Sequence, residues 1–352
     1  MSRIVDITAQ PLDLPLTESF EISLGVQHEA ANVLVTAETE SGVVGYGEGA
    51  PVPPVTGETR EAALATARAA AAVVEGRPVG DYRRLVEALR STFPGAVSAN
   101  FAVETAVLDA FCRERDIALS ELFGGMPAPV ETDITVPIDS VEGTVRRAEE
   151  AVESGFDHLK IKTGNDVHED VERVVAVREV AEDAAIKVDA NQGWTPKETR
   201  TFANAVADDG IELELIEQPV AAADVRGMAD VRRHVDVPIA ADEAVFTPAD
   251  AVRIVEAGAA DIINAKLGKS GPLAVADIVA IARGANLDCM VGCMLESSIG
   301  THTGAHVVAG MGAFSYVDLD SNRLLAEDVV ASGDGPIHEI TGPGHDVTPS
   351  NV

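Results

Sequence analysis

Lysine is nearly absent from this sequence. Six lysines occur among 352 residues, so arginine supplies the other 20 of the 26 basic side chains. A chain that places arginine at its solvated positions has little general use for lysine, so each remaining lysine indicates a specific role. Lys160 and Lys162 form a KxK pair, and Lys266 lies at the end of an apolar run. These three side chains are the first candidates for chemistry.

Cysteine is equally scarce, and the three cysteines are Cys112, Cys289 and Cys293. An odd and sparse set provides no disulfide framework for a chain of this length, which favours free thiols in a reducing compartment. Cys289 and Cys293 are four residues apart in an apolar run, a pattern more typical of buried core than of a metal pair. We assign neither of them a metal.

Long apolar segments are missing as well. One of the longest, residues 62–74, is interrupted by Thr66 and Arg68, well short of a membrane span. Residues 1–9 carry Arg3 and Asp6 and lack the apolar segment of a secretory signal. The sequence therefore predicts a soluble cytoplasmic protein.

Positive charge is also in deficit. The 58 acidic and 26 basic residues give a formal net charge of −32. Such a chain repels nucleic acid and anionic membranes, so neither is expected as a partner. A carboxylate-rich surface is typical of proteins kept soluble in concentrated salt, where ions screen the mutual repulsion. We therefore expect a halophilic setting.

The first 125 residues or so are expected to form an α+β domain. Antiparallel strands are predicted at residues 4–14, 32–38 and 43–47, with Ser41-Gly42 as a hairpin turn. Helices are predicted at residues 58–75, 81–91 and 99–115. We interpret the glycine-rich run at residues 45–49 as a flexible loop and not as a dinucleotide fingerprint.

Beyond residue 125, short apolar runs alternate with amphipathic helices. The eight runs are ITVPI, HLKIKTG, IKVDANQ, LELIEQP, PIAADEA, DIINAKLGK, CMVGCML and FSYVDLD. This alternation predicts an α/β fold with a parallel barrel inside a ring of helices, and a doubly wound open sheet is the alternative. The expected organisation is a capping domain at residues 1–125, a barrel at 126–320, and a C-terminal segment at 321–352 that returns to the cap.

Charged residues close five successive strands. Lys162, Asp189, Glu217, Asp242 and Lys266 follow one another at intervals of 24–28 residues, each interval being one βα unit. The carboxyl ends of barrel strands form the active-site face, so these side chains are expected to converge. Three adjacent carboxylates repel one another unless a cation binds, and an all-oxygen set suits Mg²⁺. We therefore predict a magnesium site flanked by an amine on either side.

The lysines then acquire a role as acid and base. Lys160 and Lys162 point to the same side of a strand, and mutual repulsion is expected to lower the pKa of each ammonium. Lys266 lies four strands on, across the barrel. Two amines facing each other over a metal-bound carboxylate can move a proton from one face of the adjacent carbon to the other. The metal and Lys160 can stabilise the resulting enediolate, so racemisation or epimerisation is predicted.

These motifs resemble those of the enolase superfamily, whose members use a Lys or His base with magnesium. LKIKTG, KVDANQGW, ELIEQPV, ADEAVF, INAKLGKSG, GCMLESSIG and DLD occur in the order of its muconate-cycloisomerase-like subgroup. They look most like dipeptide epimerases of the L-Ala-D/L-Glu type. The resemblance implies a modified TIM barrel, (β/α)₇β, with an N-terminal α+β capping domain, and a homo-oligomer. It also implies Lys162 and Lys266 as acid and base, and Asp189, Glu217 and Asp242 as Mg²⁺ ligands.

The same resemblance implies where the substrate binds. In dipeptide epimerases an acidic pair after the last strand binds the free ammonium of the substrate, and Asp318 and Asp320 occupy that place. Other residues expected to line the pocket are Thr135, Lys160, Met294 and Glu296.

One position departs from the family pattern. Epimerases for Ala-Glu carry an arginine in the early capping loop, whereas residues 20–28 read FEISLGVQH, with Gly25 at that place. A glutamate side chain would lack its partner there, so an uncharged or apolar second residue is expected. His28, in the same loop, either contacts substrate or is solvated.

Other functions remain open on this scaffold. A muconate-type cycloisomerase, an o-succinylbenzoate synthase or an N-acylamino acid racemase would use the same site without a substrate ammonium. A catalytically silent binding barrel would keep only the fold. His302 and His306 have the spacing of a helical zinc pair, as in a hydrolase, but without a suitable third ligand an ordinary helix position is favoured.

Overall fold

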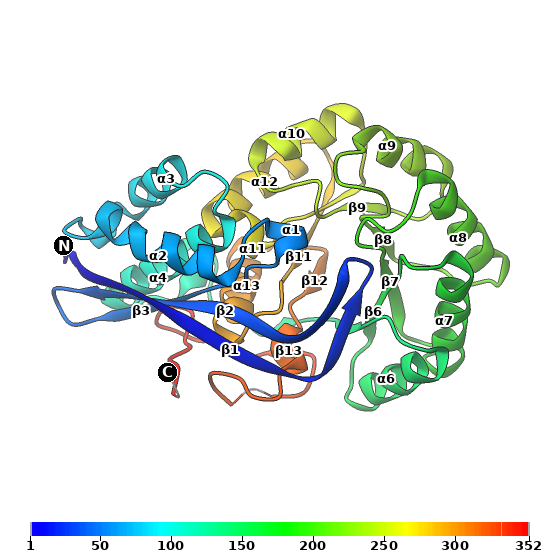
Figure 1. Cartoon of the computed structure of the whole chain (residues 1–352), viewed down its shortest axis with the longest axis horizontal. Coiled ribbons are helices and arrows are strands. Elements are labelled where there is room, and N and C mark those ends of the chain that lie inside the picture. Colours follow the sequence, from blue (N-terminus) through cyan, green and yellow to red (C-terminus); the bar gives the residue numbers. More distant parts are fainter. Residues whose placement is uncertain (1, 332, 351–352) are drawn as a thin grey trace.

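The computed structural model describes residues 2–331 and 333–350. Figure 1 shows an antiparallel sheet with helices at one end of the molecule and a parallel barrel inside a ring of helices at the other. The predicted α/β class, with a barrel and an N-terminal α+β capping domain, is confirmed.

The cap contains a three-stranded sheet in the order β1-β2-β3. Its elements are β1 (Ile4–Ile22), β2 (Gly25–Thr39), β3 (Val44–Gly49), α1 (Pro53–Thr56), α2 (Arg60–Val74), the 3₁₀ turn η1 (Val79–Asp81), α3 (Tyr82–Thr92), α4 (Val97–Arg115) and α5 (Leu119–Leu122). The core between this sheet and α2, α3 and α4 is built largely of alanine, valine and leucine.

The barrel follows as alternating strands and helices. Its elements are β5 (Ile134–Val136), α6 (Val141–Glu153), β6 (His158–Lys162), α7 (Val167–Val180), β7 (Ala185–Asp189), α8 (Pro196–Asp208), β8 (Leu215–Glu217), α9 (Val225–His234), β9 (Ile239–Ala241), α10 (Pro248–Ala257), β10 (Ile262–Asn264), α11 (Leu267–Ser270), α12 (Pro272–Gly284), β11 (Asp288–Gly292), α13 (Ser298–Met311) and β12 (Tyr316–Asp318). Beside it, β4 (Val130–Glu131) pairs with β13 (Ile337–His338), and the 3₁₀ turn η2 (Ser321–Leu324) follows β12.

Short sequence signals set where the outer helices begin. The side chain of Thr195 accepts a hydrogen bond from the backbone of Glu198, whose side chain bonds back to Thr195, and Pro196 occupies the first turn of α8. Thr247 and Asp250 make the same reciprocal cap at the start of α10. These caps satisfy backbone N–H groups that a helix start leaves free, so each βα connection ends at a defined residue.

The barrel sheet nearly closes on itself. Its order, β12-β11-β10-β9-β8-β7-β6-β5, follows the chain without reversal. Across the seam between the first and last strands, the backbone N–H of Asp133 donates to the carbonyl of Val317 at 3.2 Å. The backbone N–H of Leu319 donates to Oγ1 of Thr132 at 2.7 Å. A doubly wound sheet would reverse its strand order, so that alternative is wrong.

The glycine-rich run at residues 45–49 is not a flexible loop. It belongs to β3, where Gly45, Gly47 and Gly49 face α4. A methyl group at Gly47 would overlap the backbone carbonyl of Ala102 in α4, and the other two glycines are equally crowded by that helix. The glycines are present because strand and helix backbones approach too closely for any side chain, a constraint that the local sequence does not reveal.

The first two strands are longer than predicted. Residues 15–31 extend β1 and β2 into a hairpin that reaches from the cap to the barrel (Figure 1). Near the tip, Oγ of Ser23 donates to the carbonyls of Ala190 and Asn191, at 3.0 Å and 2.9 Å. The segment that contains Gly25 is therefore a hairpin tip docked on the loop after β7.

The C-terminal segment contacts the cap at several points. The backbone N–H of Ala326 donates to the carbonyl of Pro15 at 2.7 Å, and that of Leu119 donates to the carbonyl of Gly344 at 2.8 Å. The guanidinium of Arg113 on α4 donates to the carbonyl of Val347 at 2.7 Å. These bonds join the end of the described chain to both β1 and the α4–α5 region.

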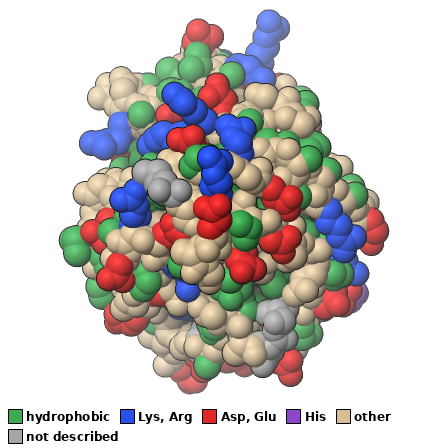
Figure 2. Space-filling model, turned by 90° about the vertical axis from the view of Figure 1, so that its left-hand side faces the viewer, with side chains coloured by type: hydrophobic (Ala, Val, Ile, Leu, Met, Phe, Trp, Pro, Cys, Tyr) green, Lys and Arg blue, Asp and Glu red, His purple; other side chains and the backbone are tan. Residues whose placement is uncertain are grey.

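The distribution of lysine is uneven. Lys197 on α8 is exposed, whereas the other five lysines are at most 6 % exposed and lie in the barrel: Lys160, Lys162, Lys187, Lys266 and Lys269. On the face drawn in Figure 2, basic side chains are interspersed with acidic and hydrophobic ones. Among the described residues, no helix combines the length and apolarity needed to cross a bilayer.

Candidate active site

Three carboxylates meet at the carboxyl ends of neighbouring strands. Lys162 on β6 pairs in register with Asp189 on β7, and Asp189 pairs with Glu217 on β8. Asp242 follows the end of β9 directly. One carboxylate oxygen from each of Asp189, Glu217 and Asp242 lies within 4.8 Å of the others, and all three side chains are buried. The convergence expected from the spacing of these residues is therefore present.

The lysines pair with these carboxylates. The ammonium of Lys162 lies 2.7 Å from Oδ2 of Asp189. The ammonium of Lys266, which follows β10, lies 2.7 Å from Oδ2 of Asp242. Three strands, β7, β8 and β9, separate the strands that carry the two lysines. The amines therefore flank the carboxylates from two sides of the barrel mouth, and both line the same pocket.

Lys160 lies between the carboxylate triad and the last strand. Its ammonium is 2.8 Å from Oε2 of Glu217, 3.2 Å from Oδ2 of Asp189 and 2.5 Å from Oδ2 of Asp318. Burial would lower the pKa of Lys160, but attraction to these carboxylates outweighs it, and the pKa lies well above its usual value. The lowering predicted from the KxK pair is wrong for Lys160, because the folded barrel surrounds this ammonium with acids from several other strands.

The donor set fits a divalent cation. Burial, followed by repulsion from Asp189, raises the pKa of Glu217 to about 7, so carboxylate charge at this position is incompletely compensated by the protein. The neighbouring groups hold the triad in place: Nδ2 of Asn264 donates to Oε1 of Glu217 at 2.7 Å, and Lys269 lies 2.6 Å from Oδ1 of Asp242. Three oxygen donors on rigid strand ends could hold Mg²⁺.

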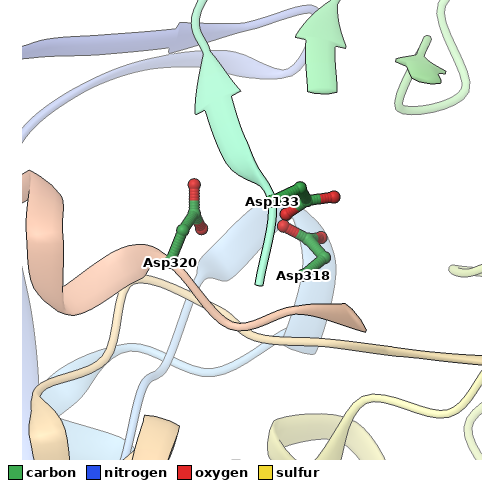
Figure 3. A group of neighbouring side chains, drawn as sticks. All are labelled: Asp133, Asp318 and Asp320. Atoms are coloured by element: carbon green, nitrogen blue, oxygen red, sulfur yellow. The ribbon is translucent and has the colours of Figure 1, made fainter. Parts of the chain in front are cut away.

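A second acidic group lies at the seam of the barrel (Figure 3). Asp133 precedes β5, Asp318 ends β12 and Asp320 follows it, and an oxygen of each lies within 4.8 Å of the others. In Figure 3 the side chains of Asp133 and Asp318 lie side by side, whereas Asp320 lies on the other side of the chain leading into β5. The backbone N–H of Thr135 donates to Oδ2 of Asp320 at 2.5 Å.

The members of this second group differ in charge. Burial would raise the pKa of Asp318, but Lys160, Lys266 and Lys162 lower it to about 2. Burial and the charge of Asp318 raise the pKa of Asp320 to about 6. Asp133 forms an ion pair with Lys187 at 2.6 Å, so its charge is largely matched inside the barrel. Asp318, which also contacts Lys160, and Asp320 both line the pocket and can accept hydrogen bonds from a cationic group.

One pocket at the barrel mouth collects most of the predicted residues. Its lining includes Thr135, Lys160, Lys162, Lys266, Met294, Asp318 and Asp320. Cys293, which the sequence placed in the core, also lines it, whereas Cys289 is buried in the core as predicted. The lining does not include Glu296, a buried residue whose carboxyl lies close to Gly268 and Gly300. Nor does it include the buried carboxylates of Asp189, Glu217 and Asp242, which lie in ion-pair contact with lysines of the lining.

Sequence reasoning missed several residues of the site. Glu243 and Asn191 line the pocket and are joined by a hydrogen bond of 3.2 Å from Nδ2 of Asn191. Burial and repulsion from Asp242 and Asp189 raise the pKa of Glu243 to about 8. Glu243 could have been predicted from the sequence, because it directly follows Asp242, an acid at the end of a strand. Asp133 and Lys187 gave no such signal, because their pairing depends on closure of the barrel.

His302 and His306 do not form a metal pair with other ligands. Nδ1 of His302 lies 2.8 Å from Oδ1 of Asp346, and Nδ1 of His306 accepts from the backbone N–H of Ser120 at 3.3 Å. Among the described residues, neither histidine belongs to a group of three potential ligands, and neither lines the pocket. The arrangement gives the zinc-hydrolase alternative no support.

The fold and this site together define a class of protein. A capped β/α barrel whose strand ends bring carboxylates and two flanking lysines into one pocket is suited to proton transfer at carbon beside a cation-bound carboxylate.

The family matches agree with that class. Residues 5–124 match the family described as "Mandelate racemase / muconate lactonizing enzyme, N-terminal domain", and residues 143–351 match "Enolase C-terminal domain-like". The chain belongs to the enolase superfamily, which confirms the resemblance found in its motifs.

Individual relatives cover nearly the whole chain. The L-Ala-D/L-Glu epimerase of Thermotoga maritima is 41 % identical over 329 residues, which are 94 % of this chain and 95 % of that protein. The hydrophobic dipeptide epimerase of Enterococcus faecalis is 36 % identical over 334 residues, which are 94 % of each chain.

Two solved structures show the same fold. The substrate-liganded L-Ala-D/L-Glu epimerase from Bacillus subtilis has a TM-score of 0.94 and 32 % identity, covering 97 % of this chain and 98 % of that one. The dipeptide epimerase from Enterococcus faecalis, complexed with Mg and L-Leu-L-Tyr, has a TM-score of 0.91 and 35 % identity over the same shares.

Proposed function

We propose that this protein is a magnesium-dependent dipeptide epimerase that inverts the carbon next to the substrate carboxylate. The observation that carries the proposal is one pocket lined by Lys162, Lys266, Asp318 and Asp320, with the buried carboxylate triad beside it in ion-pair contact with its lysines. The relatives at 41 % and 36 % identity are dipeptide epimerases, and one solved relative holds Mg and a dipeptide, which supports the same assignment.

Asp189, Glu217 and Asp242 would hold the cation. Mg²⁺ bound there supplies positive charge that acidifies the C–H beside the substrate carboxylate and competes with the lysine ammonium groups for the carboxylates, which lowers the lysine pKa. The triad lies at the ends of neighbouring strands, so a substrate carboxylate bound there would have its α-carbon between the two lysines.

Lys162 and Lys266 move the proton. One of them, as a free amine, removes the proton from one face of the α-carbon and becomes an ammonium. The other, already an ammonium, delivers a proton to the opposite face and becomes an amine. For the opposite epimer the roles exchange, so the reaction runs in both directions. Both lysines line the pocket, so their ammonium protons can exchange with solvent before substrate binds, and the new hydrogen on the α-carbon then comes from solvent.

Lys160 serves as a fixed positive charge. Its raised pKa keeps it an ammonium, placed between Glu217 and Asp318. As negative charge develops on the oxygens of the substrate carboxylate, this ammonium stabilises it at short range in a site of low polarity.

The dipeptide ammonium binds at the other end of the pocket. Asp318 and Asp320 offer it two carboxylates, and Thr135 fixes Asp320 by donating its backbone N–H. This pair favours a dipeptide over substrates of cycloisomerases, o-succinylbenzoate synthases or N-acylamino acid racemases, which carry no free ammonium and would leave Asp320 and Asp318 to share the single ammonium of Lys160.

The test is proton exchange in D₂O. We expect the protein with Mg²⁺ to incorporate deuterium at the α-carbon of the second residue of L-Ala-L-Xaa dipeptides and to form the L-Ala-D-Xaa product. Mass spectrometry and NMR of a dipeptide library measure both changes. A library in which no member gains mass or changes configuration would overturn the proposal.

We also propose a domain division and an assembly. Residues 1–125 would form the cap, 126–320 the catalytic barrel, and 321–352 a segment that returns to the cap. Residue 1 of the cap and residues 332 and 351–352 of the last segment lie outside the described part of the chain. The bonds from Ala326 to Pro15 and from Leu119 to Gly344 support the return of the last segment. A homo-oligomer is proposed by analogy with the family, and sedimentation would measure it.

The proposed setting is a cytoplasm rich in salt. The net charge of −32 and the burial of five of six lysines leave a surface on which acidic groups outnumber basic ones. Salt screens the repulsion among such groups, so the unfolding temperature is expected to rise between 0.1 M and 2 M KCl. The same charge disfavours nucleic acid and anionic membranes as partners.

A further inference from the structure

The cap side of the mouth pocket is apolar. Here the mouth pocket is the one that contains Lys162 and Lys266, and its cap wall consists of Phe20, Ile22, Gln27, Val52 and Val55. The first three residues come from the β1–β2 hairpin, and the last two come from the segment at α1. Gln27 is the one polar member of this wall, and none of the five is charged.

The wall continues into a second hollow, which we call the outer cleft. It lies between the hairpin tip and the loop at residues 51–54, and it shares Ile22, Gln27 and Val52 with the mouth pocket. The rest of its lining is Leu24, Gly25, Val26, Glu29, Ala31, Pro51, Pro53 and Pro54. Because three residues belong to both linings, the outer cleft adjoins the mouth pocket across Ile22, Gln27 and Val52.

The hairpin tip is positioned firmly although its apolar side chains are partly exposed. Ser23 anchors the tip to the barrel through the carbonyls of Ala190 and Asn191. Val26 in the outer cleft is 48 % exposed, and it lies beside further apolar residues of that cleft, Leu24, Pro51 and Pro53. A fixed apolar surface left open to solvent is typical of a binding site.

The geometry of the reaction directs one substituent toward this wall. When the α-carbon loses its proton, its three remaining substituents lie in one plane between the two lysines. The carboxylate points to the triad, and the peptide nitrogen leads to Asp318 and Asp320. The side chain of the second residue takes the remaining in-plane direction, and the cap wall is the uncharged part of the lining that is left for it.

The charges of the two linings disfavour an acidic or basic side chain on the second residue of the substrate. Within the two linings, each lysine near the floor is already paired with a carboxylate, and the outer cleft contains no basic residue. A carboxylate on the substrate would therefore lose water without gaining a partner. A basic side chain directed to the cap wall would meet no acidic residue there, since Glu243, Asp318 and Asp320 belong to other parts of the mouth pocket and Glu29 lies in the outer cleft.

We propose that the outer cleft and the cap wall bind the side chain of the epimerised residue, and that the enzyme prefers a large apolar side chain such as leucine or phenylalanine there. This specificity rests on the proposed dipeptide epimerase activity. Gln27 sits where both hollows meet and is the specificity-determining position of the wall.

The first experiment compares kcat/KM for L-Ala-L-Leu, L-Ala-L-Phe, L-Ala-L-Glu and L-Ala-L-Lys. We expect the apolar dipeptides to exceed each charged one by about 100-fold or more, because a buried unpaired charge is opposed while apolar surface is favoured. Equal or faster turnover of the glutamate or lysine dipeptide would overturn the specificity while leaving the epimerase intact. Absence of turnover with all four would instead contradict the proposed function, so the two failures are distinguishable.

The second experiment places a charge in the wall. In Gln27→Arg we expect kcat/KM to rise about 10-fold or more for L-Ala-L-Glu and to fall for L-Ala-L-Leu, because the guanidinium offers the glutamate a partner. Gln10→Arg, on an exposed part of β1 outside both linings, is the matched control and should change neither. Identical dipeptide preferences in Gln27→Arg and the control would show that the side chain binds elsewhere.

Discussion

The ammonium of Lys160 lies 2.5 Å from Oδ2 of Asp318, which joins the first half of the barrel to its last strand. The same ammonium contacts Glu217, so it bridges the carboxylates proposed for the cation and those proposed for the substrate ammonium. A dipeptide that spans the pocket would bind along this bridge. A substitution at one end of the site is therefore expected to alter binding at the other end.

Asp318→Asn tests recognition of the substrate ammonium. We expect the wild type to prefer L-Ala-L-Leu over N-propionyl-L-leucine, which has the same shape without the ammonium. In the variant the ratio of the two kcat/KM values should shrink by about 100-fold, because a charge-assisted partner is lost. The ratio is informative because loss of the Lys160 contact slows both substrates alike. An unchanged ratio would show that the ammonium binds elsewhere.

Removal of the cation is expected to abolish activity. Treatment with EDTA should stop epimerisation, and added Mg²⁺ should restore it. Mg²⁺ should also raise the unfolding temperature of the wild type, since a ligand at 100 times its Kd adds about 2.7 kcal/mol of stability. Glu217→Gln should lose this increase, whereas Asp230→Asn on the outer helix α9 should keep it. An increase retained in Glu217→Gln would argue against the triad as the cation site.

Gly47→Ala should lower stability without a direct effect on chemistry. A methyl group on β3 would overlap the carbonyl of Ala102, and forcing the strand and helix apart is expected to cost about 1–3 kcal/mol. Gly284→Ala is the matched control, because a methyl group at the end of α12 meets open space. Urea unfolding measures both, and equal free energies of unfolding for the two variants would contradict the close approach of β3 to α4.

His338 should make the protein acid-sensitive. Burial and the nearby charges of Arg323 and His302 lower the pKa of His338 from 6.5 to about 3, and its Nε2 donates to the carbonyl of Leu319 at 2.7 Å. The folded protein holds this ring neutral, so its contribution to the free energy of unfolding is fully present above pH 6.5. Below that pH the ring is protonated more readily in the unfolded chain, so the contribution is lost as the pH falls toward 3. The slope approaches about 1.4 kcal/mol per pH unit.

His338→Gln keeps a donor for Leu319 but cannot titrate. Its free energy of unfolding should therefore fall less steeply than that of the wild type between pH 6.5 and 4.5. Urea unfolding at a series of pH values gives both slopes, and equal slopes would show that His338 is not the responsible group.

The barrel and its charged mouth could be predicted because they repeat. Each βα unit places a strand end about every 25 residues, so Asp189, Glu217 and Asp242 were visible as a series. Lys162 and Lys266 stood out because lysine is so rare elsewhere. Local periodicity was sufficient for these residues, since their convergence follows from the topology alone.

Other features depended on contacts between distant segments. The hairpin at residues 15–31 extends toward the barrel, where Ser23 anchors it. No local sequence pattern predicts this contact. The glycines of β3 are explained by contacts with α4, a helix that begins 48 residues after β3 ends. The pKa of Lys160 was predicted in the wrong direction because only its neighbour Lys162 was considered, whereas folding surrounds it with Asp318, Glu217 and Asp189.

The central claim is that Lys162 and Lys266 act on opposite faces of one carbon. Proton exchange measured by NMR in D₂O, with the L,L and L,D epimers of an Ala-Leu dipeptide supplied separately, tests it in Lys162→Gln and Lys266→Gln. Each variant should fail to epimerise, and each should exchange the α-proton of one epimer only, the two variants acting on different epimers. Exchange of the same epimer by both variants, or epimerisation by either of them, would contradict the two-lysine account.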